Sequence, residues 1–243
     1  MIDVYSGLSV PAELAPAYAG VTDGIELLAR TLTGPMRGRV AVVSSFGAES
    51  AVLLALAAEI DPAVPVIFLE TGKHFPETLA YRDRLAGLLG LVDVRDIRPD
   101  PVALDDEDPI GNLHEFDADG CCAVRKVAPL ARALHGFEAW ISGRKRHQAS
   151  TRTALAFIEP DQGRWKINPL ADWTPARIAA EHRRRNLPTH PLVAAGYPSI
   201  GCAPCTRPVA PGESARAGRW AGLTKTECGI HRAPAGGFVP AHA

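Results

Sequence analysis

The sequence predicts an α/β fold, in which a mostly parallel β-sheet carries helices on both faces. An apolar run over residues 39–46 precedes a helical pattern over 48–60, and a second apolar run over 64–69 precedes another helical pattern over 76–89. Chains that alternate strands and helices of this length form parallel sheets, and right-handed crossovers place the helices on the two faces. The strands are short and almost wholly apolar, as strands buried on both faces are.

Local signals support each of these elements. The first helix is indicated by Val52, Leu56 and Ile60, which recur at helical spacing after a tight turn at Gly47. The second helix opens with Pro76, a residue favoured in the first helical turn. Two strand–turn–helix units are therefore expected in the first third of the chain.

The middle of the chain continues this alternation. A third strand is expected over 92–97, a third crossover helix over 121–134, and a fourth strand over 139–142 that ends at Gly143. The sheet should therefore contain at least four strands.

The pattern then weakens. Residues 154–160 and 164–167 fit a hairpin, and residues 174–186 fit a helix with Thr174 as its N-cap. The Pro-rich run 187–211 is expected to be irregular. Loops of this length in a compact domain are usually functional.

The composition is that of a globular protein with one sizeable core. Of 243 residues, 47% are hydrophobic and 22% are charged, and the formal net charge is −1. No apolar run could span a bilayer, no export signal is visible, and the charge does not favour a long nucleic-acid surface. We expect a cytoplasmic protein that binds neither membranes nor nucleic acid, with a mobile Ala/Gly/Pro-rich end over 233–243.

Five cysteines carry the most information about function. They are Cys121, Cys122, Cys202, Cys205 and Cys228. The first two are adjacent and the next two form a C-x-x-C pair, a grouping that binds metals more often than it forms disulfides or stays as inert buried thiols. Cys228 is left over from the four, in the string ECGIH, and is a candidate nucleophile with His231 three residues further on.

Three polar turns follow strands of the predicted sheet. They span 44–50 (SSFGAES), 69–73 (LETGK) and 142–146 (SGRKR). Ligands of open α/β sheets lie beyond the carboxyl ends of the strands, where backbone N–H groups and helix N-termini favour anions. Each turn alone is a weak signal, because serines before a helix are often N-caps and basic triplets are often solvated. Together they predict a nucleotide across the sheet edge, with Gln148, Ser150 and Arg152 as further anion-binding donors.

Eight strings occur in an order that is recognisable as a set: SSFGAES, TGKHFPET, CCAVRK, SGRKRHQASTR, KINPLADW, YPSIGCAPCT, RAGRW and KTECGIH. They resemble the iron–sulfur type of the assimilatory adenylyl-sulfate (APS) and phosphoadenylyl-sulfate (PAPS) reductases of bacteria and plants. The resemblance covers 39–231, and the Cys-Cys, C-x-x-C and ECGxH combination is its most specific part. It implies an adenine-nucleotide α-hydrolase-like fold, related to that of the PP-loop ATP pyrophosphatases.

The resemblance also implies roles for individual residues. The ligands of one [4Fe-4S] cluster would be Cys121, Cys122, Cys202 and Cys205, consistent with four thiolates being the usual set. The nucleotide would be lined by Ser45, Gly47, Glu49, Thr71 and Gly72. The phosphosulfate would be surrounded by Lys126, Arg144, Arg216, Arg219 and His231. Residues 1–38 would form an N-terminal helical segment, 39–211 the nucleotide- and cluster-binding domain, and 212–243 a C-terminal segment with the catalytic cysteine.

The implied reaction is the thioredoxin-dependent reduction of APS to sulfite and AMP in sulfate assimilation. The Cys228 thiolate would attack sulfur, expel AMP and carry an S-sulfo group, and the pKa of its thiol would be lowered by the surrounding cations, His231 among them. If four cysteines hold the cluster, no second free thiol remains in the chain. An external dithiol, thioredoxin or a glutaredoxin-like protein, would then release sulfite.

The sequence departs from the related families at two positions, and several alternative functions stay open. Glu70 stands where the family usually has Asp, and Glu49 with a single Gly47 differs from the PP-loop enzymes in a way that argues against ATP hydrolysis. The enzyme alternatives are a PAPS reductase and a dual-specificity reductase, and a homo-oligomer is left open. The non-enzyme alternative is a nucleotide-binding module stapled by zinc. Trp173 and Trp220 are expected to pack rather than to stack on a ligand.

Overall fold

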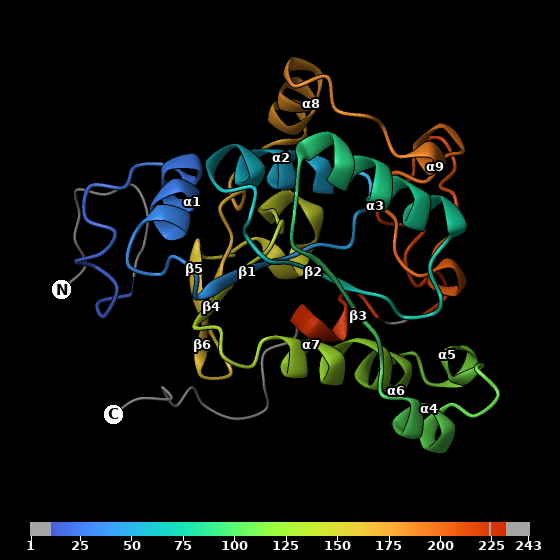
Figure 1. Cartoon of the computed structure of the whole chain (residues 1–243). Helices are drawn as coiled ribbons and strands as arrows, with labels where there is room; N and C mark the ends of the chain where they lie inside the picture. The colour runs from blue at the N-terminus through green and yellow to red at the C-terminus, as the bar shows by residue number, and fades with distance from the viewer. Residues whose placement is uncertain (1–10, 224, 232–243) are drawn as a thin grey trace.

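A six-stranded, mostly parallel sheet organises the computed structural model, which describes residues 11–223 and 225–231 (Figure 1). The strands are β1 (Val40–Val43), β2 (Val66–Leu69), β3 (Val94–Ile97), β4 (Ala139–Ile141), β5 (Ile158–Asp161) and β6 (Arg164–Ile167). Their order is β3-β2-β1-β4-β6-β5, and only β5 runs antiparallel, in a hairpin with β6. The predicted fold class is confirmed.

Helices cover both faces of this sheet. The α-helices are α1 (Gly24–Thr33), α2 (Ser50–Ile60), α3 (Pro76–Leu89), α4 (Pro101–Glu107), α5 (Leu113–Phe116), α6 (Ala118–Cys122), α7 (Ala128–Ala133), α8 (Pro175–Arg184) and α9 (Pro191–Ala194). A π-helical segment, η1 (Ala123–Val127), joins α6 to α7. The short 3-10 helices are η2 (Arg146–Gln148), η3 (Ser150–Arg152), η4 (Ala203–Cys205) and η5 (Gly229–His231). Helices α1, α2, α3 and α8 lie on one side of the sheet, and α6, η1 and α7 lie on the other (Figure 1). None of the helices in the described part of the chain is long and apolar enough to cross a membrane.

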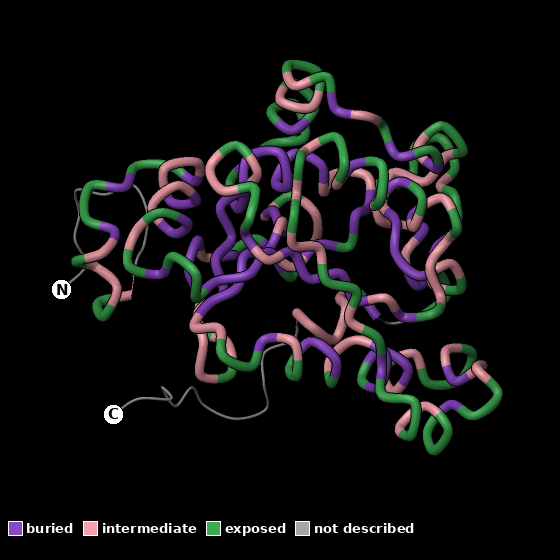
Figure 2. The backbone as a smooth tube through the Cα atoms, viewed as in Figure 1, coloured by how far each residue is buried: buried purple, intermediate pink, exposed green. Residues whose placement is uncertain are grey.

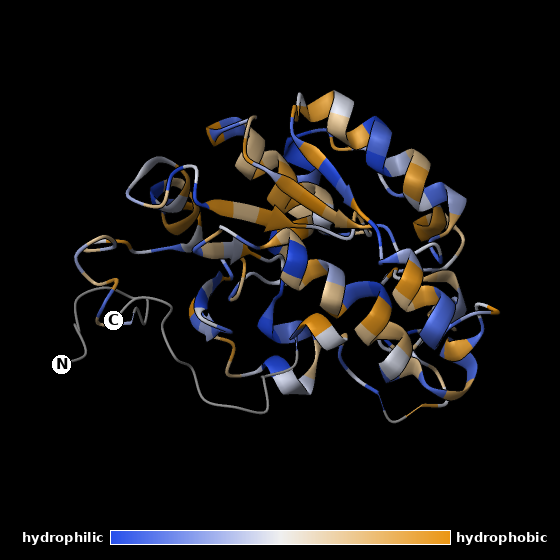
Figure 3. Ribbon diagram, turned by 60° about the horizontal axis from the view of Figure 1, so that its bottom comes forward, coloured by the Kyte–Doolittle hydropathy of each residue, from blue (hydrophilic) through white to orange (hydrophobic). Residues whose placement is uncertain are grey.

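Strand side chains alternate between two cores. Val40 and Val42 face the larger core, with α1, α2 and α3, while Ala41 faces the smaller core with α7. In β2, Phe68 faces the larger core and Ile67 faces the smaller one. This period-two alternation explains why β1, β2 and β4 are wholly apolar, because both of their faces are covered. Figure 2 shows these central strands as buried and Figure 3 shows them as hydrophobic, whereas the edge strand β3 is intermediate to exposed.

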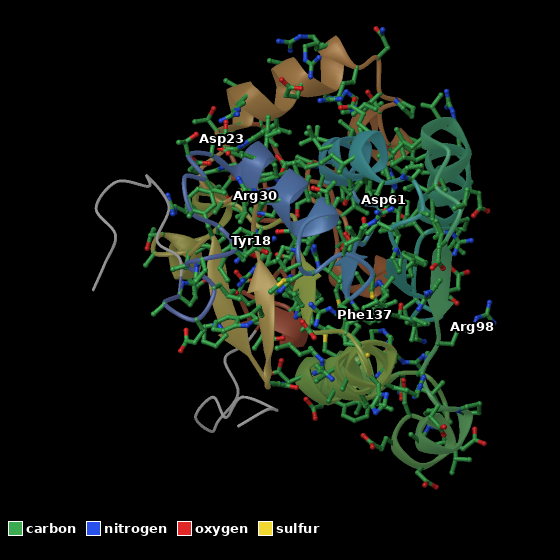
Figure 4. All side chains as sticks on the ribbon, turned by 60° about the vertical axis from the view of Figure 1, so that its left-hand side comes forward. Tyr18, Asp23, Arg30, Asp61, Arg98 and Phe137 are labelled. Atoms are coloured by element: carbon green, nitrogen blue, oxygen red, sulfur yellow. The ribbon has the colours of Figure 1, made fainter. Side chains whose placement is uncertain are left out.

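Two helix starts illustrate how the sequence determines local structure. Asp23 caps α1 by accepting hydrogen bonds from the N–H groups of Ile25 and Glu26, both at 2.8 Å (Figure 4). Thr174 caps α8 by accepting one from the Arg177 N–H at 3.2 Å, so the predicted N-cap is confirmed.

The predicted helix over 121–134 differs in form from the expectation. The helix starts earlier, at Ala118 after the Asp117 cap, and its middle turn is the π-helical η1, in which the Ala128 N–H bonds to the Ala123 carbonyl. Pro129 follows at once and cannot donate a hydrogen bond, and its ring would clash with the carbonyl four residues earlier in a regular helix. The wider turn accommodates the proline.

Other boundaries also shift. The hairpin strand β5 begins at Ile158 rather than at residue 154, and the run 187–211 contains α9 and η4 within an otherwise irregular path. The prediction for 233–243 and the first ten residues of the predicted N-terminal segment lie outside the described residues.

The strand order creates a switch point. From β1 the chain goes outward through β2 to β3, then returns to place β4 on the other side of β1. Crossovers on either side of this point leave a crevice at the carboxyl ends of the strands, where α/β proteins bind their ligands.

Candidate active site

A cavity of about 300 Å³ lies at this switch point, beyond the carboxyl ends of β1 and β4. It is bordered by the predicted turns 44–50 and 142–146, by Leu69 at the start of the third turn, and by the segment that carries Cys228. The predicted site residues that line it are Ser45, Gly47, Glu49, Lys126, Arg144, Arg152, Arg216, Arg219, Cys228 and His231. Segments far apart in the sequence therefore meet at one site.

Thr71 and Gly72 do not line this cavity. The Thr71 hydroxyl lies 3.4 Å from the Cys202 sulfur and accepts a hydrogen bond from the Lys73 N–H, while the Gly72 N–H donates to the Glu70 carboxylate at 2.8 Å. This turn supports the cysteine loop, and the place of Thr71 and Gly72 at the nucleotide stays a prediction. The unusual Glu70 holds the backbone of the turn.

The first turn is shaped by Phe46, whose φ of 48° lies in the left-handed region. Its N–H donates to the Ser44 hydroxyl at 3.2 Å, and its buried ring packs edge-on against Phe68 at 5.7 Å. A Cβ at Gly47 would lie 3.2 Å from the Ile200 carbonyl oxygen, so glycine suits this close approach. The turn is held open toward the cavity by packing.

Glu49 is engaged by the basic turn. Its carboxylate accepts hydrogen bonds from Lys145 Nζ at 2.9 Å and from Gln148 Nε2 at 2.7 Å. Burial acts to raise the pKa of Glu49, but Lys145 outweighs it and lowers that pKa. Lys145 is only 2% exposed, so the basic triplet is not a solvated face. Sequence reasoning missed this pair because its members are 96 residues apart.

Arg144 is also buried beside carboxylates. Its guanidinium pairs with Glu159 and donates to the Asn168 side-chain oxygen at 3.3 Å. Burial, with Arg152 nearby, lowers the pKa of Arg144 to about 10, so the group stays charged at neutral pH. Its Nε is buried without a hydrogen-bond partner among the described residues, which leaves one donor available.

Lys126 and Arg219 are the cavity cations that have no carboxylate partner within residues 11–223 and 225–231. Burial acts to lower the pKa of Lys126, but the thiolates of Cys202 and Cys228 outweigh it and raise that pKa. The Arg219 guanidinium passes so close to Gly201 that a Cβ there would lie 2.2 Å from its Nη2. Arg219 also donates to the Ile200 carbonyl at 3.3 Å, but no carboxylate in the described residues neutralises either cation, so both can bind an anion.

The thiol of Cys228 has the electrostatic character of a nucleophile. A hydrogen bond from Cys122 lowers its pKa, burial opposes this, and the charge of Lys126, the Ile230 N–H and Arg219 lower it further. The net pKa lies well below the ordinary value of 9.0. The two cations and the backbone N–H favour the thiolate whatever the protonation state of Cys122.

His231 differs from the expectation of a cationic residue. Burial lowers its pKa well below 6.5, and the charges of Arg144, Lys166 and Arg152 act in the same direction. Its ring is stacked on Trp140, with centroids 5.9 Å apart and planes 10° apart. The imidazole is therefore neutral at neutral pH and does not help to lower the Cys228 pKa by its charge.

The other four cysteines line a second, small cavity next to Lys126. All five cysteines are free thiols. Burial raises the pKa of Cys121, and nearby Cys202 and Cys205 contribute to the increase. Cys122 lies between the two cavities, because it lines the second one and its side chain also interacts with Cys228, which lines the first. No three Cys, His, Asp or Glu side chains in the described residues are arranged around a single ion position.

Trp220 connects the two cavities. This residue borders both of them. The Arg219 guanidinium lies over its ring, 4.4 Å from the ring centroid, and the backbone N–H of Trp220 donates to the Cys205 carbonyl. Its φ of 50° is unusual for a bulky residue. Trp173, by contrast, is a buried core residue at 1% exposure, as expected.

Comparison with known proteins identifies the family. Residues 39–208 match the phosphoadenosine phosphosulfate reductase domain. The chain belongs to this family. The adenosine 5'-phosphosulfate reductase of Mesorhizobium japonicum is 53% identical over 229 residues, which cover 94% of this chain and 90% of the relative. The phosphoadenosine 5'-phosphosulfate reductase of Gloeobacter violaceus is 43% identical over 198 residues, 79% of this chain and 82% of the relative.

A solved structure supports the same assignment. The crystal structure of the PAPS reductase of Candida auris, a phosphate complex, superposes with a TM-score of 0.65 at 25% identity. The alignment covers 82% of this chain and 99% of that one. The resemblance read from the eight sequence strings is therefore confirmed.

The donor set of the second cavity fits a family cofactor. Four thiols that form no disulfide border one cavity, and four thiolates are the ligand set of a [4Fe-4S] cluster, with one for each iron. In this reductase fold, the π-helical η1 carries Lys126 one turn after Cys122. The lysine can therefore face both cavities.

Proposed function

We propose that the protein reduces adenylyl sulfate to sulfite and AMP, with Cys228 as the nucleophile. The observation that carries this proposal is the position of the Cys228 thiolate in the switch-point cavity, beside Lys126 and Arg219. Cations without carboxylate partners can clamp phosphate and sulfate oxygens, and they also lower the pKa of a thiol. Family membership and the relatives named adenosine 5'-phosphosulfate reductase support the choice of reaction.

The first step is a displacement at sulfur. The Cys228 thiolate forms a bond to the sulfur of APS, and the bond from that sulfur to the phosphate oxygen breaks. AMP leaves with the electron pair, and Cys228 becomes S-sulfocysteine. Lys126, Arg216 and Arg219 orient the phosphosulfate and offset its charge, so that sulfur lies in line with the nucleophile.

The second step needs an external dithiol. One thiolate of thioredoxin, or of a glutaredoxin-like protein, attacks the Cys228 sulfur, sulfite leaves, and a mixed disulfide forms. The second partner thiol then resolves that disulfide, so the partner is oxidised and Cys228 is restored. This chemistry requires reduced cysteines, which supports a cytoplasmic location.

Cys121, Cys122, Cys202 and Cys205 would hold one [4Fe-4S] cluster. When bound, the cluster would supply negative charge near Lys126 and tie α6 to η4 and the residue before it. Sulfite release by thiol chemistry requires no electrons from it. Purified under anaerobic conditions, the protein should contain about four irons per chain. Stoichiometric zinc without iron would instead support the zinc-stapled module.

PAPS is the second candidate substrate, because the Gloeobacter violaceus relative is named for it. Steady-state rates with APS and PAPS, each with thioredoxin, test the choice. We expect kcat/KM to be much higher for APS. Equal or higher kcat/KM for PAPS would reject the preference, and no sulfite from either substrate would reject the function.

A further inference from the structure

The segment that carries Cys228 is anchored at two positions just before the nucleophile. At the first, Glu227 accepts hydrogen bonds from Arg152, with Nε to Oε1 and Nη2 to Oε2 both at 2.6 Å. The Thr151 hydroxyl adds a third at 3.1 Å. The side chains of the pair are 7% and 12% exposed, so the interaction is largely removed from water.

The second anchor lies two residues before Glu227. Lys225 Nζ forms an ion pair with Asp119 and donates to the Ala118 carbonyl at 3.2 Å. Both acceptors belong to α6, which ends in the cysteine pair. Lys225 also lies over the Trp220 ring, 5.8 Å from its centroid.

We propose that Arg152 and Asp119 are positioning residues. The pairs Arg152–Glu227 and Asp119–Lys225, called the clasp below, hold residues 225–231 in place. The clasp thereby keeps the Cys228 thiolate beside Lys126 and Arg219. The inference rests on the proposed function for the identity of the reaction. The geometry of the clasp itself is independent of it.

Each of the three nitrogens of the Arg152 guanidinium already donates a hydrogen bond within the protein. Nε and Nη2 donate to Glu227, and Nη1 donates to the Gln148 side-chain oxygen at 2.5 Å. A substrate ligand is better served by a cavity residue with an unpaired donor, such as Arg144, whose Nε has no hydrogen-bond partner among the described residues. Arg152 is therefore better suited to holding the segment than to holding the anion.

The pair should persist at neutral pH. Burial acts to raise the pKa of Glu227, but the hydrogen bonds and charge of Arg152 outweigh it and lower that pKa. Removing either partner would leave a buried charge without compensation, which is strongly unfavourable. Either loss should therefore loosen the segment by a similar amount.

Hydrogen exchange measures the clasp without turnover. In full-length protein as purified, Glu227→Gln and Arg152→Gln should each accelerate amide exchange in peptides that span 225–231 by about tenfold. Exchange in β1 and β4 should stay unchanged. The double variant should show little further acceleration, because both changes break the same interaction. Asp119→Asn tests the other anchor and should also accelerate exchange.

A matched control is available on the surface. Arg207 and Glu213 form a similar two-bonded pair, with both bonds at 2.9 Å, but its side chains are 45% and 33% exposed. Glu213→Gln should leave exchange in 225–231 and the kinetic constants unchanged. Unchanged exchange in both Glu227→Gln and Arg152→Gln would overturn the clasp.

Kinetics distinguish positioning from substrate binding. If the clasp positions Cys228, Glu227→Gln and Arg152→Gln lower kcat by about tenfold or more and leave the KM for APS within about twofold. If Arg152 binds the substrate, Arg152→Gln raises KM, and Glu227→Gln lowers KM because it frees the guanidinium. That result would overturn the proposal. If wild-type protein does not turn over APS, the proposed function fails, and the exchange data still test the clasp.

Discussion

Cys228 and Cys205 occupy similar surroundings but differ in thiol chemistry. Both are partly buried, and both lie near Lys126 and Arg219, whose charges act to lower a thiol pKa. Burial nevertheless raises the pKa of Cys205, with help from Cys202, whereas the pKa of Cys228 falls well below its ordinary value. Shared cations therefore do not explain the difference.

The difference comes from hydrogen-bond donors. Cys228 accepts a hydrogen bond from the Ile230 N–H, which does not depend on the state of Cys122, and the pKa of Cys205 is lowered by no hydrogen bond of this kind. A donor aimed at sulfur stabilises that thiolate alone, while a cation acts on every thiol near it and does not distinguish between them. The comparison teaches that the turn at η5, as well as the cation cluster, makes Cys228 the nucleophile.

Removal of the nucleophile should have the largest effect. Cys228→Ser should reduce sulfite production by at least about 10³-fold, because a hydroxyl cannot replace the thiolate. Iron content and APS binding, followed by metal analysis and calorimetry, should be retained. Normal sulfite production by this variant would show that Cys228 is not the nucleophile.

Loss of the shared cation should come next. Lys126→Met should lower kcat/KM by about 10²-fold and move the acid limb of Cys228 alkylation to higher pH, because the thiolate loses a stabilising charge. The pH dependence of iodoacetamide labelling, read by peptide mass spectrometry, checks the direction. An unchanged profile would mean that the hydrogen bonds to Cys228 alone set its pKa.

A smaller effect should follow from crowding Arg219. Gly201→Ala places a methyl group against the guanidinium, so Arg219 must move, and kcat/KM should fall by about tenfold. Gly87→Ala is the control, because a Cβ at that helical position meets nothing within 4 Å. It should leave activity unchanged. Equal kinetics for the two variants would show that the position of Arg219 is unimportant.

The smallest effect should come from Thr71. Thr71→Val removes the hydroxyl beside Cys202 but keeps the shape, so the KM for APS should stay within about twofold while iron is lost more readily on exposure to a chelator. A large rise in KM with stable iron would instead show that Thr71 contacts the nucleotide, as the family resemblance implies.

The sequence predicts the sheet and the two groups of cysteines because both signals are local. The residues that form an apolar strand, the Thr174 cap or the C-x-x-C pair lie within a few positions of one another in the sequence. The partners of the polar turns are not local: Glu49 meets Lys145 across 96 residues, and Glu227 meets Arg152 across 75. No periodicity indicates such pairs, so Arg152 was expected at the substrate.

Two other features depend on three-dimensional context. Whether His231 is charged depends on its burial against Trp140 and on four neighbouring cations from separate parts of the chain. The need for glycine at position 201 depends on the path of Arg219, which is 18 residues away in the sequence. The motif identifies both residues, but only the fold shows how they act.

One measurement tests the central claim most directly. Wild-type protein is mixed with APS in the absence of any dithiol, and AMP release and the mass of the peptide containing Glu227, Cys228 and Gly229 are followed. The account predicts one AMP per chain, a stable sulfonate on Cys228 and no further turnover, with none of these in Cys228→Ser. A sulfonate on another cysteine, or continued AMP release without an adduct, would contradict it.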